Sequence, residues 1–322
     1  MEIKHDIHTH TTLSRCCYDP KATVANYVRR AAELGHTVFG LSNRLWDEKV
    51  PGASSWYKNQ MISYGLQQKE CIPADTCGLK VLCGTETEFF AAKHTLGMLA
   101  ETAKQFDYVL VPHSHMHMRN SVMNDNDDSL AVRRLFAERI ASVLPELSEA
   151  QVQKMAWALG YGEMDTFVSN DTFFPHTVDM VEYCARFMVD SFNELMANSE
   201  FEKLARTVPT SIAHPFHPCG FSKDMQKKII DAVPSEELTE CFKRAHALGV
   251  AIEINTGTFI HPENDYAEEP FIRVMKLALA AGCRFTFGTD THSLAGLDNI
   301  RKGDDISRLV GITEADLADI VK

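Results

Sequence analysis

Five short clusters along the chain are rich in the residue types that bind metal ions. Within most of them the polar residues stand two positions apart, and the candidate residues are His8, His10, Glu86, Glu88, His113, His115, His117, His214, Asp290 and His292. Side chains two apart on a strand point to the same side, so that two of them can reach one ion. Histidine, glutamate and aspartate ligands suit Zn, Mn or Fe. The sequence therefore predicts a metal centre assembled from distant segments.

Each cluster taken alone also has an ordinary explanation. A His-x-His pair can lie on the surface, and Glu86 and Glu88 can belong to an acidic loop. Their shared position argues for function, because each cluster follows an apolar run that predicts a strand, and barrel active sites form at the carboxyl ends of parallel strands. The candidate ligands outnumber what one ion needs, which implies two or three ions. Asp6 shares the side of His8 and His10 and could accept a ring N–H from one of them.

The elements that position these clusters alternate along the chain. Several strand runs are apolar on both faces, which is typical of parallel strands covered by helices. The predicted strands span 3–8, 38–42, 80–86, 107–112, 210–213, 250–255 and 284–288. The predicted helices span 21–34, 95–105, 178–198, 225–233, 236–248 and 270–281. This alternation predicts an α/β fold, and the absence of a dividing linker predicts a single domain over 1–322.

One stretch, about 117–174, breaks the alternation because it contains no convincing strand. Residues 130–144 and 148–159 have helical patterns, which predicts a helical insertion after the fourth strand. A small separate helical domain is the alternative. An insertion on such a loop would lie over the mouth of a barrel and could act as a lid.

Composition excludes several classes of protein. The chain has 322 residues, of which 45% are hydrophobic and 24% charged, close to an average globular protein. Its net charge of −12 argues against a dedicated nucleic-acid binder but not against a small anionic substrate. No apolar run is long enough to span a membrane, and the first residues lack a signal-peptide pattern. The nine cysteines form no CxxC pair, which favours reduced thiols in a cytoplasmic protein.

The motifs together resemble those of the PHP (polymerase and histidinol phosphatase) family. They follow one another in order from residue 6 to 293, as Asp6-Ile7-His8-Thr9-His10-Thr11, Gly84-Thr85-Glu86, Asp107-Tyr108-Val109, Ala213-His214-Pro215, Glu253-Ile254-Asn255 and Gly288-Thr289-Asp290-Thr291-His292-Ser293. The resemblance implies a distorted seven-stranded (β/α)7 TIM-like barrel. It also implies hydrolysis of phosphate esters with two or three bound metals.

The resemblance further implies which residues bind which ion. It places His8, His10, Glu86 and Asp290 around one metal. Glu86, His214 and a histidine after the fourth strand would hold a second. We prefer His115 for that histidine, although the family spacing falls on Ser114 and leaves His113 open. His292 would serve a third metal.

The third site is where the chain departs from the family. The family usually supplies two more histidines where this chain has Arg15-Cys16-Cys17 and Ser42-Asn43-Arg44. Either the third metal is absent or different ligands hold it, with Cys16 as a thiolate ligand or as a structural residue. Arg44 cannot bind a cation, but it could hold the substrate phosphate or pair with Asp47 or Glu48.

The predicted function is metal-dependent hydrolysis of a phosphate monoester of a small metabolite, similar to that of a histidinol phosphatase. A hydroxide shared by two cations would attack phosphorus, with Glu86 joining the metals and Asp290 or His292 passing a proton to the leaving group. Arg15, Arg44 and Arg119 are candidates for phosphate contacts, and Arg119 has an ordinary surface position as its alternative.

Three other functions stay open. A nuclease acting on nucleotide ends is disfavoured by the acidic balance and the absence of a basic stripe. Amidohydrolases also use His-x-His on a first strand, but no strand here ends in their metal-bridging lysine. A catalytically silent metal-binding regulatory protein would explain Asn43 and Arg44.

Overall fold

The computed structural model describes most of the chain. The described residues are 1–53, 57, 60–91, 94–115, 138, 141, 145–146, 148–149, 152, 180–219, 221, 223–259 and 269–322. Nearly all of the predicted insertion at 117–174, with its two predicted helices and its lid role, lies outside them. His117 and Arg119 lie outside them too.

The strands form two parallel sheets and one small hairpin. In the first sheet, β1 (His5–Asp6), β2 (Val38–Leu41) and β3 (Lys80–Cys83) are neighbours in that order. The second sheet has the order β10 (Phe285–Gly288), β9 (Ala251–Asn255), β8 (Thr210–Ala213), β7 (Val109–Pro112) and β4 (Thr85–Glu86). The hairpin pairs β5 (Phe89–Phe90) with β6 (Thr95–Leu96) in antiparallel register. Each of the seven predicted strand runs contains a strand of a parallel sheet.

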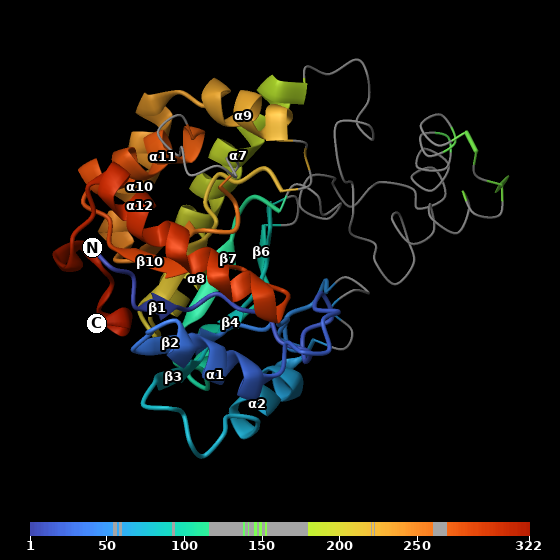
Figure 1. Ribbon diagram of the computed structural model, residues 1–322. Coiled ribbons are helices and arrows are strands. Elements are labelled where there is room, and N and C mark those ends of the chain that lie inside the picture. Colours follow the sequence, from blue (N-terminus) through green and yellow to red (C-terminus); the bar gives the residue numbers. More distant parts are fainter. Residues whose placement is uncertain are drawn as a thin grey trace.

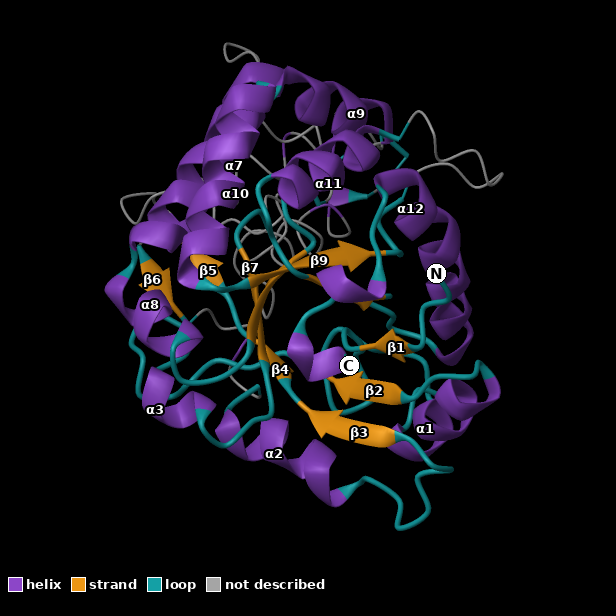
Figure 2. Cartoon of the chain, turned by 90° about the vertical axis from the view of Figure 1, so that its left-hand side faces the viewer, coloured by secondary structure: helices purple, strands orange, loops and turns teal. Residues whose placement is uncertain are grey.

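Helices lie around the strands (Figures 1 and 2). Among the described residues they are α1 (Val24–Glu33), α2 (Ile62–Glu70), α3 (Ala100–Ala103), α7 (Met180–Ala197), α8 (Ser199–Ala205), α9 (Lys223–Ala232), α10 (Ser235–Leu248), α11 (Pro270–Ala280) and α12 (Lys302–Val310). Short 3-10 helices follow at η3 (Leu294–Arg301), η4 (Glu314–Asp316) and η5 (Asp319–Val321). A search of the described residues found no helix with both the length and the apolar character that crossing a membrane requires.

The helix predicted over 95–105 is wrong at its start. Thr95 and Leu96 belong to β6, where they pair with Phe90 and Phe89, and the helix begins only at Ala100. The buried aromatic pair on β5 gives this short segment a partner strand, and that tertiary contact overrides the helical pattern.

The structure is a mixed α/β fold with parallel sheets, but it does not confirm the predicted seven-stranded barrel. β1 and β4 are each only two residues long, so the strands divide into sheets of three, five and two. Backbone hydrogen bonds nevertheless join the segments around β1 and β10. Ile7 N donates to Phe287 O over 3.1 Å, and Asp290 N donates to His8 O over 2.8 Å. β1 and β10 are edge strands of the two sheets, and their carboxyl ends therefore lie side by side.

Gly84 and Tyr108 make the junction between the two sheets at β3 and β4. A Cβ at Gly84 would collide with the Tyr108 ring, so only glycine lets the chain pass. The Tyr108 hydroxyl bonds to Ile7 O at 2.6 Å and lies 3.1 Å from Leu41 O. These contacts tie β1, β2 and the β3–β4 run to the start of β7.

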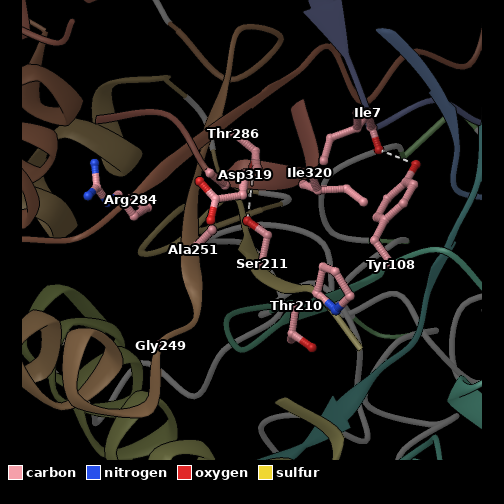
Figure 3. A pocket seen from close by; sticks show the side chains of 12 residues that line it. Ile7, Tyr108, Thr210, Ser211, Gly249, Ala251, Arg284, Thr286, Asp319 and Ile320 are labelled. Carbon is pink, nitrogen blue, oxygen red and sulfur yellow. Dashed lines mark hydrogen bonds between the residues drawn. The ribbon is translucent and has the colours of Figure 1, made fainter. Parts of the chain in front are cut away.

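The amino ends of β8, β9 and β10 border a cavity of about 280 Å³. It is lined by Ile7, Tyr108, Ser211 and Thr286. Asp319, the first residue of η5, also borders it (Figure 3). The hydroxyls of Ser211 and Thr286 form a hydrogen bond of 2.9 Å in the wall of this cavity. The cavity contains none of the predicted metal ligands.

We expect His5 to make the fold sensitive to acid. Burial, aided by His36, lowers the pKa of His5 to about 3, and its Nε2 accepts a hydrogen bond from Phe287 N. The unfolded chain binds this proton near pH 6.5 and the folded chain does not, so stability is present above pH 6.5 and is lost as the pH falls toward 3. Between pH 7 and 4 the free energy of unfolding should fall by about 3 kcal/mol through this residue.

Urea unfolding at several pH values measures this effect. His5→Gln should reduce the pH dependence, and the same exchange at exposed His246 provides the control. Equal pH dependence in the wild type and His5→Gln would contradict the assignment.

Candidate metal centre

Four side chains from three distant segments converge on one point. His8 and His10 follow β1, Glu86 ends β4 and Asp290 follows β10. The Nε2 atoms of the two histidines are 3.2 Å apart. Each of them lies 3.2–3.3 Å from Glu86 Oε2 and 3.0–3.3 Å from Asp290 Oδ1. All four ligand atoms lie within 4.8 Å of one another, which suits a single divalent cation.

His115 and His214 form a second group beside the first. Their Nε2 atoms are 3.3 Å apart, and His214 Nε2 lies 3.3 Å from Glu86 Oε1. His115 Nε2 lies 3.7 Å from the same oxygen. Glu86 therefore turns one oxygen toward each group, which is the position of a carboxylate that bridges two cations.

A buried carboxylate orients one histidine in each group. His8 Nδ1 donates to Glu253 Oε1 over 2.7 Å, and His115 Nδ1 donates to Glu88 Oε2 over the same distance. These bonds leave the Nε2 lone pairs directed into the centre, as metal-binding histidines require. Tyr57 Oη donates a hydrogen bond to Glu88 Oε2 over 3.1 Å. Neither Glu253 nor Tyr57 was predicted to orient a ligand, although Glu253 belongs to the quoted motif.

Asp6 has a different place from the one predicted. Its carboxylate accepts bonds from the backbone N–H groups of His8 and Thr289, each at 3.1 Å, and from Thr289 Oγ1 at 2.7 Å. The ring of His8 bonds to Glu253 instead. Asp6 thus fixes the backbone where β1 meets β10, and burial raises its pKa to about 7.

The structure places His113 outside both groups. Its Nε2 accepts a bond from Phe216 N at 2.9 Å, and its ring packs edge-on against Phe192 and Phe216. Burial lowers the pKa of His113 to about 3, consistent with a neutral ring. Of the two alternatives after the fourth strand, only His115 joins the convergent side chains.

His292 lies on the outer side of the first group. Its ring stacks on His10 with centroids 4.5 Å apart, and its Nδ1 donates to Asp290 O over 2.8 Å. His10, Cys16 and His292 form a further set of ligand atoms within 4.8 Å of one another. Burial alone would lower the pKa of His292, but the bond to Cys16 and the charge of Asp290 raise it.

Arg44 has a partner that the sequence did not suggest. Its Nη1 lies 3.1 Å from Glu86 Oε2, and the side chain is almost fully buried. Burial favours neutral Arg44, but the Glu86 carboxylate outweighs it and holds the Arg44 pKa well above its usual value. The carboxylate that pairs with Arg44 is therefore that of Glu86, rather than that of Asp47 or Glu48 as the alternative prediction had it. Arg15 lies nearby, with its backbone N–H donating to Gln60 Oε1 at 2.9 Å.

Left-handed backbone occurs at two of the convergent residues. His214 has φ +30° and Asp290 has φ +51°, and neither is a glycine. Such conformations are costly and gather at functional sites, where the surrounding structure enforces them.

We expect Glu253→Gln to weaken metal binding without unfolding the protein. A neutral amide is a poorer acceptor for His8 Nδ1–H, and loss of such outer partners typically lowers affinity by about 10–100-fold. Zinc titration against a chelator measures the change, with exposed Glu314→Gln as the control. Unchanged affinity in Glu253→Gln would show that this carboxylate does not prepare the ligand.

Comparison with known proteins identifies the fold. No protein-family model matches the chain, and a search of curated proteins finds no match. Among solved structures, the chain is similar to a histidinol phosphate phosphatase from Lactococcus lactis subsp. lactis, complexed with zinc, L-histidinol and phosphate. The TM-score is 0.56 with 16% sequence identity, over 97% of this chain and 95% of that one. The protein therefore shares the fold of that phosphatase across nearly its whole length.

Proposed function

We propose that the protein is a PHP-family phosphatase that hydrolyses phosphate monoesters of a small metabolite with a pair of divalent cations. The observation that carries this proposal is the position of Glu86, with one carboxylate oxygen toward each group of imidazoles. The fold shared with a zinc-containing phosphatase supports it.

The proposal includes one distorted barrel over 1–322. The bonds between the segments of β1 and β10 support a closed arrangement, as does the run from β3 through Gly84 into β4. In such a barrel the two candidate cation sites would lie at the carboxyl ends of the strands.

The donor atoms suit divalent cations by their chemistry. Glu253 keeps a proton on His8 Nδ1, so a neutral His8 turns its Nε2 lone pair toward two carboxylate oxygens 3.3 Å away. Those acceptors repel one another unless a positive charge joins them. In the protein alone, Glu253, Asp290 and Glu86 raise the pKa of His8 well above its usual value against the effect of burial. The negative charge of these carboxylates, which attracts a proton to His8, would also attract a metal cation.

Each proposed ligand set follows from these contacts. His8, His10, Glu86 and Asp290 would hold the first cation, and Glu86, His115 and His214 the second. Bound cations would supply Lewis-acid stabilisation of the phosphoryl oxygens and an activated water. Zinc suits these ligands, while manganese and iron remain compatible with them.

The remaining residues would handle the phosphate and the proton. Asp290 is 23% exposed whereas Glu86 is fully buried, so Asp290 faces the side from which a substrate arrives. His292 beside it, with its raised pKa, would protonate the leaving alcohol. Arg44 offers further N–H donors beyond the one on Glu86 and would bind a phosphate oxygen. Arg15 is a second candidate for this contact.

A catalytically silent metal-binding protein is the second candidate. The observation that favours it is the ion pair between Arg44 and Glu86, because it occupies an oxygen that the first cation would use. Turnover of a phosphate monoester separates the two candidates.

We expect Glu86→Gln to abolish turnover. The amide cannot balance two cations, and losing their charge stabilisation of several kcal/mol should lower kcat at least about 1000-fold. Hydrolysis of p-nitrophenyl phosphate and L-histidinol phosphate by zinc-loaded protein, with metal content by elemental analysis, measures the effect. Exposed Glu240→Gln is the control. Near wild-type turnover with full metal content would refute the bridging role.

We expect Arg44→Met to weaken phosphate binding more than metal binding. A charge-assisted hydrogen bond is worth about 1.5–3 kcal/mol, so kcat/KM should fall about 10–100-fold and inhibition by inorganic phosphate should weaken similarly. Arg44→Lys should recover part of the loss because it keeps the charge without the planar fork. If phosphate inhibition is unchanged while zinc content changes, Arg44 acts on Glu86 alone.

A further inference from the structure

The segment after β8 curls back toward the candidate metal centre. His214 and Phe216 both have left-handed backbone, with φ +30° and +59°. His217 N donates to His214 O over 3.1 Å, and Cys219 N donates to His217 O over 2.9 Å. Two successive tight turns thus return the chain, five residues after His214, to the side of the same histidine.

These turns bring the Cys219 thiol to the second group of ligands. Its Sγ and the ligand nitrogens of His115 and His214 all lie within 4.8 Å of one another. Both imidazoles also lie near Glu86 Oε1, at 3.7 and 3.3 Å. A sulfur donor therefore lies beside the two imidazoles of the proposed second site.

His217 contacts the Cys219 thiol and is held in one orientation. Its Nδ1 lies 3.1 Å from Cys219 Sγ, and its Nε2 lies 3.3 Å from Gln226 Oε1. Gln226 Nε2 donates to Phe221 O over 2.9 Å, which fixes the amide with its oxygen toward His217. The proton of the neutral ring consequently belongs on Nε2. His217 Nδ1 is left as an acceptor facing the sulfur.

We propose that Cys219 is a thiolate ligand of the second cation, together with Glu86, His115 and His214. On cation binding the S–H bond would break, the proton would pass to water, and a sulfur–metal bond would form in its place. This inference rests on the cation pair of the proposed function.

A sulfur ligand changes which ion the second site selects. Thiolates favour soft or borderline ions such as zinc, cobalt and cadmium over the hard ions magnesium and manganese. The first site has only nitrogen and oxygen donors within the four-residue group, so the two sites would differ in preference. We expect manganese to compete less well for the second site than for the first.

Cobalt substitution provides the test, because a thiolate ligand gives cobalt(II) a near-ultraviolet charge-transfer absorption that nitrogen and oxygen ligands do not. The full chain, freed of metal, is titrated with cobalt and its absorption recorded. Wild type should develop the band and Cys219→Ser should lose it. Both measurements are made in a Cys16→Ser background, because the Cys16 thiol lies in another candidate ligand group, and Cys71→Ser, at an exposed thiol outside these groups, is the matched control in that background. It should keep the band.

Each outcome decides the proposal. In the Cys16→Ser background, a band that persists in Cys219→Ser, disappears in Cys71→Ser or is missing when Cys219 is present overturns it. If Cys219→Ser fails to fold, zinc X-ray absorption of Cys16→Ser should still show sulfur at about 2.3 Å, averaging about half a sulfur per zinc for two bound ions, and its absence overturns the proposal. Elemental analysis and phosphatase assays of the same samples report separately on the proposed function. A protein that binds two cobalt ions with no sulfur contact would refute only the Cys219 ligand.

Discussion

A single buried carboxylate sets the requirements for the rest of the centre. Glu86 is fully buried, yet Arg44 and His8 hold its pKa well below the usual value against the effect of burial. A buried charge without partners would cost several kcal/mol, so its neighbours must supply compensating charge. Without a bound cation, Arg44 after β2 and His8 after β1 supply that charge, and His10 and His214 add hydrogen bonds. The convergence of strand ends on Glu86 therefore meets an electrostatic requirement of its burial.

Around this carboxylate, the same arrangement occurs twice. Glu253 behind His8 and Glu88 behind His115 each accept Nδ1–H over 2.7 Å and direct Nε2 inward. Glu253 also accepts the backbone N–H of His214 over 2.6 Å, so it joins a ligand of the first group to the strained turn of the second. The two groups are consequently coupled through a shared support as well as through Glu86.

The sequence predicted the parts of this structure that depend on local pattern. Apolar runs located the parallel strands, and the two-residue spacing of His8 and His10 predicted that their rings meet. The pairing of Thr95 with Phe90, the Arg44–Glu86 contact and the bond from His8 to Glu253 depend on residues far apart in the chain. Asp6 was assigned to a ring because it shares a strand with His8, whereas Glu253 reaches that ring from the neighbouring sheet. Cys219 was not predicted as a ligand, because its return to His214 depends on two successive tight turns and on left-handed backbone at His214 and Phe216, which no local pattern indicated.

Anomalous X-ray diffraction at the zinc edge, from crystals grown with zinc, tests the central claim most directly. The account predicts two peaks on opposite sides of the Glu86 carboxylate. One should lie among His8, His10 and Asp290, and the other between His115 and His214. A single peak, or peaks that leave Glu86 without contact to both ions, would contradict the account.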